Sequence, residues 1–545
     1  MARQNVILVT TTNYVERAYS IGTVSFKKQI LFREPSRVFA KRSSGIYKPT
    51  VVSQRYSHRI MGLATRLAVS LLAVVVVARA QTIEQLGGNR IGPAEVDATV
   101  MRLMKAAEVP GVGIAIIDRD QVMYEKAYGF RDTEKKLPLT TDTVMSGASL
   151  TKAAFAYMAM QLVQEGRLDL DRPVYEYLSK PLPEYQQYAD LKDDPRYKQI
   201  TARMLLDHTS GFPNWRAFED DHKLHVHFAP GSRFSYSGEG MDLLQLVAET
   251  ITKQDLQTLM QERVFGPLGM TRTCMVWQPG FDTNYANGYD EYGRTIEPQR
   301  WTRAEAAGSL LTTVHDFGRF VAAVMRGEGL NKKVWREMLR AQVLIHSKHQ
   351  FSSLEETTTN ENDTIKLSYG LGWGLFWTPQ GEAFFKEGHE VGERNYTVAF
   401  PEKKIGIVIL SNSANGEGIY KDLLETLLHD TYTPIEWEGF TPYNKLPPRP
   451  PLKHHKRAAV EPAVLEKYVG RYSDPVHFPN VILTIRRDGD HLSVQENDEP
   501  RQELLPESVT EFYSADSDDE YTFAADGSKL ILHADGKDIP FPRLP

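Results

Sequence analysis

The sequence has little cysteine and no apolar run long enough to cross a membrane as a helix. Cys274 is the single cysteine in 545 residues, which excludes an intrachain disulfide framework and any zinc site built from several cysteines. The twelve-residue apolar run at 67–78 falls short of the roughly 20 residues that a bilayer-spanning helix needs. We therefore expect the fold to be stabilised by packing in its hydrophobic cores.

The first 80 residues differ from the rest of the chain. Residues 1–60 carry eleven Lys/Arg against two acidic residues, so we expect an unstructured or over-extended N-terminus. Residues 61–80 combine a basic start at Met61, the apolar run and an Ala-Arg-Ala cleavage site before Gln81. They predict a secretory signal peptide and a periplasmic or extracellular protein. A basic organellar presequence with a sorting segment is the alternative.

Without residues 1–80 the chain is acidic. It holds 51 basic and 68 acidic residues, a net charge of −17. This sign argues against nucleic acid as a partner and gives no reason for attraction to anionic lipid. We expect a small-molecule or short-peptide substrate and no stable membrane span after signal cleavage, while the oligomeric state has no signal in the sequence.

Hydrophobic periodicity predicts a mixed α/β (α+β) domain at 84–435. An N-terminal hairpin, a helical middle and returning strands indicate an antiparallel sheet, built from both chain ends, flanked by helices and joined by a helical subdomain. The expected elements are a helix at 84–102, strands at 111–118 and 122–128, a helix at 150–165, strands at 369–373, 396–400 and 405–411, and a helix at 418–429.

Two further segments follow. Residues 436–461 include Pro447, Pro448, Pro450 and Pro451, followed by a basic run, and they predict a stiff linker. Residues 462–545 hold only short alternating segments separated by Asp-Gly turn signals, which predict a small antiparallel β-barrel. This barrel carries no catalytic constellation of its own.

Ser149 and Lys152 form the clearest candidate for chemistry, at the start of the best predicted helix. Residues three apart share a helix face, so Ser149 Oγ and Lys152 Nζ can meet. A lysine among apolar side chains can have a pKa low enough to take the serine proton, and a helix N-terminus favours the negative charge that develops. Alone, Ser-x-x-Lys is more simply a helix cap followed by a surface lysine.

Tyr236-Ser237-Gly238 and the segment 388–392 are the second and third candidates. A tyrosine near Ser149 and Lys152 can relay a proton, because adjacent ammonium charge favours its phenolate. The segment 388–392 could supply an oxyanion donor and place His389 against the substrate. Each has a simpler interpretation by itself, as a half-buried loop tyrosine or a histidine at a strand start.

Together the three segments resemble the serine β-lactamase/penicillin-binding-protein-like superfamily, above all class C β-lactamases and their esterase, D-aminopeptidase and D-alanyl-D-alanine carboxypeptidase relatives. The resemblance covers roughly residues 94–430. It rests also on four segments that are similar to the family's sequences but carry no catalytic residue: LLDHTSGFP (205–213), VFGPLGM (264–270), AAGSLLTTVHDFGRF (306–320) and YGLGW (369–373). It implies a β-lactamase/transpeptidase-like fold and a serine hydrolase without cofactor or metal.

The resemblance also implies roles for single residues. Ser149 would be the acylated nucleophile, Lys152 its activating partner, and Tyr236 the general base and acid. The strand box at His389 would correspond to the family's Lys-Thr-Gly box, with oxyanion donors at the N–H of Ser149 and on the strand after His389. Gly392 and Arg394 would help to bind the substrate, with Arg394 a candidate for a substrate carboxylate, although a surface arginine is an equal interpretation.

Two residues depart from the family pattern. Gly238 stands where Tyr-x-Asn has its asparagine, and Val391 stands where the box ends in glycine. The first removes an amide and the second adds bulk beside the substrate, so we expect esters to be favoured over β-lactams. A catalytically retired relative that binds peptidoglycan-like peptides or assembles with partners is the alternative from a different class.

Some of these residues, and a few others, also fit the patterns of different catalytic or metal sites. Gly147-Ala148-Ser149-Leu150-Thr151 is one residue short of the Gly-x-Ser-x-Gly nucleophile elbow of α/β-hydrolases. His389-Glu390 begins a zinc-binding His-Glu-x-x-His pattern that no second histidine completes. Two further alternatives are a Ser210–His208 pair, more simply a turn, and a zinc site in the polar loop of Asp220, Asp221, His222, His225 and His227, more simply a solvated rim.

Overall fold

The computed structural model describes most of the chain beyond the predicted signal peptide, which lies outside the described residues and stays a prediction. Within the described part, no helix has the length and apolar character that a membrane crossing requires. The described residues are 82–219, 221–351, 354, 357–449, 455–474, 481–497, 501–514, 519–534 and 537–545.

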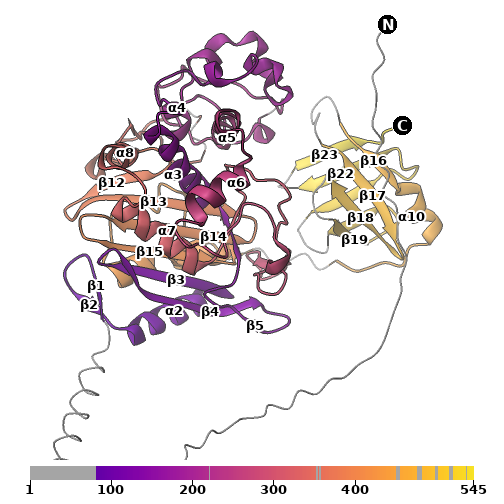
Figure 1. Cartoon of the computed structure of the whole chain (residues 1–545). Coiled ribbons are helices and arrows are strands. Elements are labelled where there is room, and N and C mark those ends of the chain that lie inside the picture. Colours follow the sequence, from indigo (N-terminus) through magenta and orange to yellow (C-terminus); the bar gives the residue numbers. More distant parts are fainter. Residues whose placement is uncertain are drawn as a thin grey trace, which may run out of the picture. The chain divides into compact units, whose positions relative to one another are not determined.

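A nine-stranded antiparallel sheet forms the centre of the main domain (Figure 1). Its order is β10-β11-β12-β13-β14-β15-β3-β4-β5. Because β15 pairs with β3, for example at Ile409 and Ile114, the sheet joins both ends of the domain, as the sequence predicts. The strands are β3 (Gly111–Asp118), β4 (Gln121–Asp132), β5 (Leu137–Pro138), β10 (Val343–Leu344), β11 (Ser368–Tyr369), β12 (Gly374–Thr378), β13 (Gly381–Glu390), β14 (Glu393–Phe400) and β15 (Ile405–Ser411).

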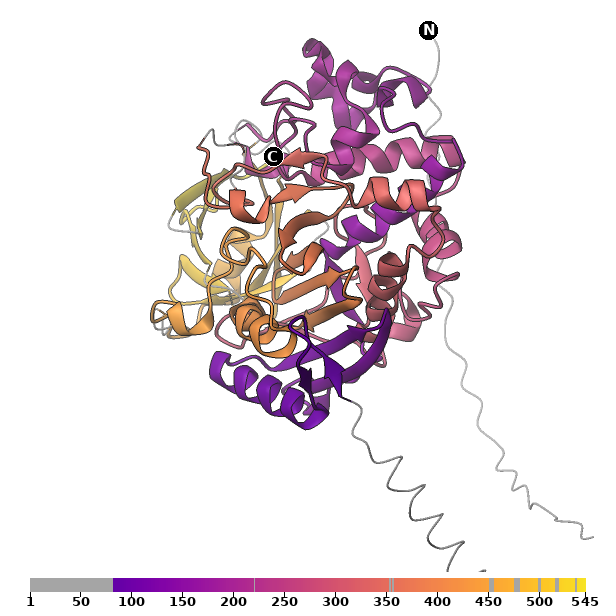
Figure 2. The same cartoon turned by 90° about the vertical axis from the view of Figure 1, so that its left-hand side faces the viewer.

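Helices cover both faces of this sheet. One core contains α3 (Leu150–Gln164) and α7 (Val314–Arg326), and the other lies under α2 (Pro93–Ala107) and α9 (Tyr420–Leu423), which lie side by side in Figure 2. The predicted helices at 150–165 and 418–429 are confirmed in position. The remaining helices of four or more residues in the main domain are η1 (Val174–Tyr177), η3 (Gln186–Asp193), η4 (Pro195–Gln199), α4 (Ala202–Leu206), α5 (Gly238–Thr252), α6 (Leu256–Met260), η6 (Gln261–Phe265), α8 (Lys332–Met338), η9 (Ala414–Ile419) and η10 (Leu424–Leu428).

Two predicted elements are wrong in detail. The expected helix at 84–102 is split, because Gly88 turns the chain with a φ of +80° between β1 (Ile83–Glu84) and β2 (Arg90–Ile91), and α2 begins only at Pro93. The expected strand at 369–373 is a turn between β11 and β12, closed by a hydrogen bond from Gly370 N to Trp373 O (2.8 Å).

The predicted linker begins inside the domain. The side chains of Ile435, Trp437 and Phe440 are buried in the core under α9, and Trp437 Nε1 donates to Ser347 O (3.1 Å). Farther on, Arg449 donates to the Glu108 carboxylate (3.0 Å). Residues 434–449 therefore form a C-terminal extension that packs on the domain, because its apolar side chains cover core that the sheet leaves open.

We expect a chain that ends at Leu446 to fold and a chain that ends at Thr433 to lose stability. The shorter chain lacks the side chains of Ile435, Trp437 and Phe440, and each fully buried apolar side chain contributes about 1.5–3 kcal/mol. Thermal unfolding of both chains measures the difference. Equal melting temperatures would show that the extension adds nothing to the domain.

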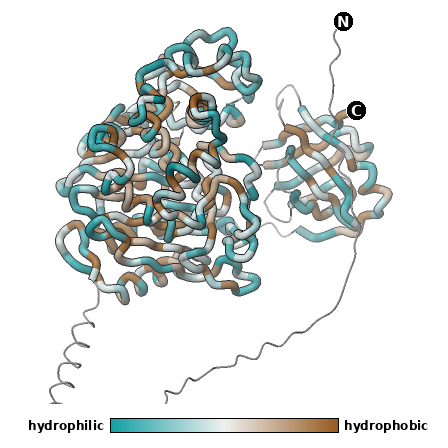
Figure 3. Tube along the Cα trace, in the orientation of Figure 1, coloured by the Kyte–Doolittle hydropathy of each residue, from teal (hydrophilic) through white to brown (hydrophobic). Residues whose placement is uncertain are grey.

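The C-terminal part forms the predicted antiparallel barrel. Its eight strands are paired in chain order, and Ser473 N and Leu544 N donate back to Pro542 O and Arg471 O, which nearly closes the ring. Figure 3 shows hydrophobic and hydrophilic stretches along these strands. The elements are α10 (Pro462–Tyr468), β16 (Gly470–Tyr472), β17 (Leu483–Asp488), β18 (His491–Glu496), β19 (Gln502–Pro506), β20 (Glu511–Ser514), β21 (Glu520–Phe523), β22 (Lys529–Ala534) and β23 (Lys537–Pro542).

Candidate active site

Ser149 sits at a sharp turn between β6 (Met145–Ala148) and α3. Ala148 has a φ of +46°, a conformation that costs an L-residue free energy and that is found where function requires it. Thr151 Oγ1 fixes this turn, since it donates to Ala148 O (2.5 Å) and accepts from Leu310 N (3.0 Å). The half-buried Ser149 is the N-cap residue of α3 but makes no capping hydrogen bond, so its hydroxyl remains available.

Lys152 lies one helical turn from Ser149 and is completely buried. Its Nζ donates to Ser149 Oγ (2.9 Å) and to Ala307 O (2.6 Å). Burial, helped by the positive charge of Lys386, lowers the pKa of Lys152 to about 7. A large fraction of this lysine is therefore neutral near pH 7, as a base beside the serine requires.

Tyr236 faces the same space from the loop before α5. Ser237 N donates to His208 Nδ1 (3.2 Å), which fixes the backbone next to the tyrosine, and the His208 ring packs 4.5 Å from the Tyr236 ring. Lys386 Nζ, on β13, donates to Tyr236 Oη (3.0 Å). A hydrogen bond also joins Tyr236 to Ser149. The three predicted catalytic side chains thus meet at one place.

The expected phenolate at Tyr236 is not favoured. Burial comes first among the causes, the charge of Glu387 follows, and together they raise the pKa of Tyr236 well above its ordinary value. Lys386 does not reverse this, because its ammonium is shared with Glu387 Oε1 (2.5 Å). The neutral phenol suits the role of proton donor, and Lys152 is the better base.

The predicted strand box lies three residues too far along the chain. The residue that contacts Tyr236 is Lys386, and the residue that lies against the serine turn is Gly388, where an added Cβ would be 2.4 Å from Gly147 O. Lys386-Glu387-Gly388 therefore fits the family's Lys-Thr-Gly box better than a box that begins at His389. The sequence held this signal, a Lys-x-Gly triplet directly before His389.

If the box is Lys386-Glu387-Gly388, Val391 no longer replaces the box glycine, and the expectation that its bulk disfavours β-lactams loses its basis. The box glycine is present as Gly388, and Val391 is 68% exposed at the tip of the β13–β14 hairpin. Gly392 completes this tight turn with a φ of +80°. Val391 therefore borders the pocket from the hairpin tip but does not occupy the position of the box glycine beside Ser149.

His389, Gly392 and Arg394 all border the pocket in front of Ser149. Arg394 Nε donates to the Glu417 carboxylate (2.7 Å), so its charge is already paired. Partial burial and then Arg394 lower the pKa of His389 to about 4, which makes its imidazole neutral near pH 7. This arrangement weakens the case for Arg394 as a carboxylate-binding residue.

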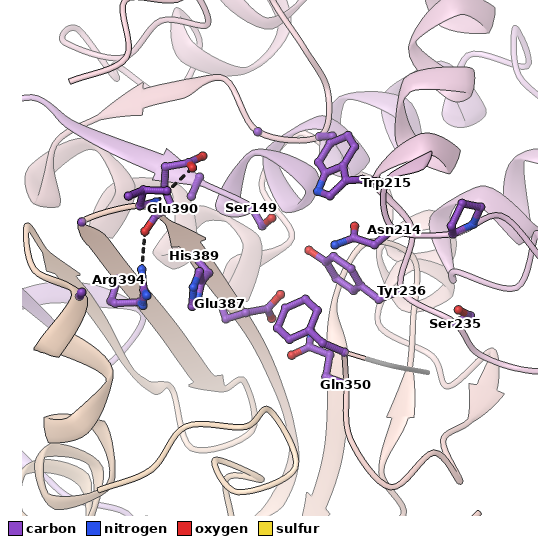
Figure 4. Close-up of a pocket in the computed structure, with 18 of the residues that line it drawn as sticks. Ser149, Asn214, Trp215, Ser235, Tyr236, Gln350, Glu387, His389, Glu390 and Arg394 are labelled. Carbon is purple, nitrogen blue, oxygen red and sulfur yellow. Dashed lines mark hydrogen bonds between the residues drawn. The ribbon is translucent and has the colours of Figure 1, made fainter. Parts of the chain in front are cut away.

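The pocket has a volume of about 720 Å³, large enough for a small peptide or drug-sized ligand. Along one wall, β13 pairs with β12 only as far as Phe385, so residues 386–390 have no strand partner on that side within the described part of the chain. Figure 4 shows Ser149, Trp215, Tyr236 and Glu387 around a common space. Other residues that line it are Asn214, Asp290, Ala307, Gln350, Phe351, Glu390 and Arg394.

Steric crowding by Trp215 explains why position 238 is a glycine. A Cβ at this position would lie 2.6 Å from the Trp215 ring, and that ring covers the Lys152 ammonium at 5.7 Å. The indole thus fills the space that the family's asparagine would need. No local pattern in the sequence singled out Trp215 or Gln350 as pocket residues.

We expect Gly238→Asn to destabilise the protein and to slow catalysis. Forcing a side chain into packed space costs about 1–3 kcal/mol, and displacement of Trp215 uncovers Lys152. Denaturant unfolding and ester kinetics measure both effects. Gly280→Asn is the matched control, because an added Cβ at Gly280 meets no atom within 4 Å. Unchanged stability of Gly238→Asn would contradict the steric account.

Neither the Ser210–His208 pair nor a zinc site in the polar loop is assembled from the described residues, outside which Asp220 of that loop lies. Ser210 Oγ accepts from Phe212 N (3.3 Å), whereas His208 Nδ1 accepts from Ser237 N, so they do not form a nucleophile–base pair. In the polar loop, His225 pairs with Asp221 and His227 with Glu219 in separate contacts. Among the described residues, no three His, Cys, Asp or Glu side chains are grouped as metal ligands.

A serine at the start of a buried helix, facing a free sheet edge, with helices on both faces of an antiparallel sheet, is the fold of serine β-lactamases and penicillin-binding proteins. The chain belongs to the beta-lactamase family, whose model matches residues 96–429. Membership of this family places the protein, in general terms, in the serine hydrolase superfamily.

Individual relatives are distant. The chain is 25% identical to protein flp of Staphylococcus aureus strain MRSA252 over 336 residues, covering 58% of this chain and 62% of that protein. It is 24% identical to penicillin-binding protein 4* of Bacillus subtilis strain 168, covering 76% of this chain and 91% of that protein. An octameric penicillin-binding protein homologue from Pyrococcus abyssi has a similar fold, with a TM-score of 0.51 at 22% identity over 82% of this chain and 99% of that one.

Proposed function

We propose that this protein is a serine hydrolase that cleaves an amide or ester bond through an acyl-enzyme on Ser149. The observation that carries the proposal is the completely buried Lys152, whose Nζ lies 2.9 Å from Ser149 Oγ and whose pKa is lowered to about 7. A purely structural lysine has no need of this combination. The substrate class is a small acyl or D-amino-acid derivative.

Acylation in this proposal moves two protons. Ser149 Oγ attacks the carbonyl carbon as its proton passes to neutral Lys152, and the new C–O bond forms. The bond to the leaving group breaks as Tyr236 protonates that group and recovers a proton from Lys386 at 3.0 Å. The N–H of Ser149 and one on the free edge of β13 at His389 would stabilise the oxyanion.

Deacylation restores both groups. Water attacks the acyl carbon, its proton passes through Tyr236 to Lys386, and Lys152 returns the first proton to Ser149 Oγ. The products are the free acid and the original enzyme. The protein's own residues supply every proton transfer, in line with two-step covalent catalysis.

Covalent labelling tests the proposal. The protein is incubated with a fluorophosphonate and with a labelled penicillin, and adducts are mapped by mass spectrometry. We expect an adduct on the peptide that contains Ser149. No adduct together with no ester turnover would instead favour the alternative, a retired relative that binds peptides or partners.

A further inference from the structure

Asp242 is an acidic residue near Lys152 that the proposed mechanism does not use. It lies on α5, four residues after Gly238, so the two positions share one face of this helix and are one turn apart. Asp242 is partly buried, and its Oδ1 is inaccessible and has no hydrogen-bond partner among the described residues. Because a buried polar oxygen without a partner costs free energy, the position of this carboxylate calls for an explanation.

One residue, Ala307, connects Asp242 to Lys152. The Asp242 carboxylate accepts a hydrogen bond from the backbone N–H of Ala307. The carbonyl oxygen of Ala307 in turn accepts from Lys152 Nζ (2.6 Å), which also donates to Ser149 Oγ (2.9 Å). A displacement of Ala307 would therefore move an acceptor that directs the lysine amine toward the serine.

The loop 304–309, which carries Ala307, is held against α5 at two further points. Gln245 follows Asp242 by three residues on the same face of α5, and its Nε2 donates to Ala304 O (2.9 Å) while its Oε1 accepts from Ala306 N (2.8 Å). Gln245 makes both contacts without a charge. Holding this loop therefore does not by itself require a carboxylate at position 242.

The charges of Asp242 and Lys152 act on each other. Burial lowers the pKa of Lys152, the positive charge of Lys386 adds to this, and the negative charge of Asp242 opposes it. Burial likewise raises the pKa of Asp242, the charge of Glu305 adds to this, and the positive charge of Lys152 opposes it. The carboxylate is therefore close enough to stabilise the ammonium form of Lys152.

Asp242 borders a different cavity from the substrate pocket. This second cavity has a volume of about 200 Å³, and none of its lining residues also lines the pocket in front of Ser149. Asp242 can therefore affect the reaction only through Lys152 and Ala307. The other ionisable or charged residues around the second cavity are Tyr188 on η3, Arg216, Glu239 and Glu249 on α5, Arg303 and Glu305.

We propose that Asp242 is a positioning residue that holds Ala307 against Lys152 and, through its negative charge, stabilises the ammonium form of that lysine. The hydrogen bond to Ala307 orients the amine, and the charge sets the pH range in which the neutral amine can act as the base. This rests on the proposed function of Lys152. It also means that α5 supports the lysine from the turn that follows Gly238.

Two substitutions separate the charge of Asp242 from its hydrogen bond. Asp242→Asn keeps an oxygen for the Ala307 N–H but loses the charge, so we expect the midpoint of kcat/KM against pH to fall while the plateau at high pH is kept. For p-nitrophenyl acetate, the ratio of kcat/KM at pH 6 to that at pH 8.5 should rise by about threefold or more. Asp242→Ala also loses the acceptor, so it should show the same fall in midpoint with a lower plateau.

Glu249→Gln is the matched control. Glu249 lies on α5 and borders the same cavity, but it is two helical turns beyond Asp242, roughly 10 Å along the helix axis. Removing its charge should leave the midpoint unchanged. A purely structural role of Asp242 would lower the plateau without moving the midpoint, and that result, or an equal movement in Glu249→Gln, would overturn the inference.

The two proposals can fail separately. Absence of a fluorophosphonate adduct on Ser149 would defeat the proposed function, but the ionisation of Lys152 can still be followed directly. In protein that carries ¹³C-labelled lysine, the Cε resonance that is missing from Lys152→Met reports this ionisation by NMR. We expect this resonance to titrate at lower pH in Asp242→Asn than in the wild type. Equal titration in both proteins would overturn the role of Asp242 regardless of the reactivity of Ser149.

Discussion

Ser149→Ala is expected to lower kcat/KM for p-nitrophenyl ester hydrolysis by at least about a thousandfold. Loss of the nucleophile removes the covalent route altogether, and groups that act as a unit lose most of their effect when one is removed. The fold should persist, because Ser149 Oγ makes no capping hydrogen bond in α3. Steady-state kinetics measure the fall in kcat/KM, and mass spectrometry measures the loss of the phosphonate adduct.

Ser210→Ala is the matched control for this prediction. Ser210 is a buried serine beside His208, and its Oγ accepts from Phe212 N. We expect it to keep near-native turnover and the adduct on Ser149. If Ser149→Ala retained hydrolysis while Ser210→Ala lost it, the nucleophile would be assigned to the wrong serine.

The rate of acylation is expected to follow the ionisation of Lys152. Only the neutral amine can take the serine proton, and its pKa is lowered to about 7, so kcat/KM should rise tenfold per pH unit below that value and level off above it. Lys152→Met should lose a hundredfold or more in rate. The pH dependence of kcat/KM for an uncharged ester measures the midpoint.

Lys386→Met gives this prediction a sharper form. Lys386 is the largest charged contributor that lowers the pKa of Lys152, so its removal should move the midpoint to higher pH as well as lower the rate. Lys404→Met, a surface lysine near Asp120, should leave the profile unchanged. A midpoint that stayed the same in Lys386→Met would show that the profile reports another group.

Sequence reasoning located the parts of the site that are built locally. Helix α3 follows from apolar spacing that ends at Gly166, and the β3–β4 hairpin follows from its turn, where Arg119 and Asp120 adopt positive φ values of +56° and +61° that suit a two-residue hairpin. Ser149 and Lys152 share one helix face, so a spacing of three residues was enough to join them.

The residues that reach the pocket through tertiary packing could not be found in this way. Trp215 fills the space beside Gly238, and Gln350 is held by Trp437, a residue far along the chain. The strand box was predicted three residues too far along the chain, because histidine is a common first residue of this box and His389 fits that pattern. The role of Lys386 depends on its contact with Tyr236, which lies 150 positions away in the sequence.

The pairing of β3 with β15 has a consequence for how the protein reaches its active form. Val112 lies opposite Ser411, so the central sheet cannot close while the ribosome is still adding the middle of the chain. Contacts this remote make folding slow, and until then the β3 edge offers unpaired backbone to other chains. Ser149 and Lys152 are synthesised early, but the contact between Tyr236 and Lys386 can form only after β13 has been made, so the complete candidate site depends on the late strands.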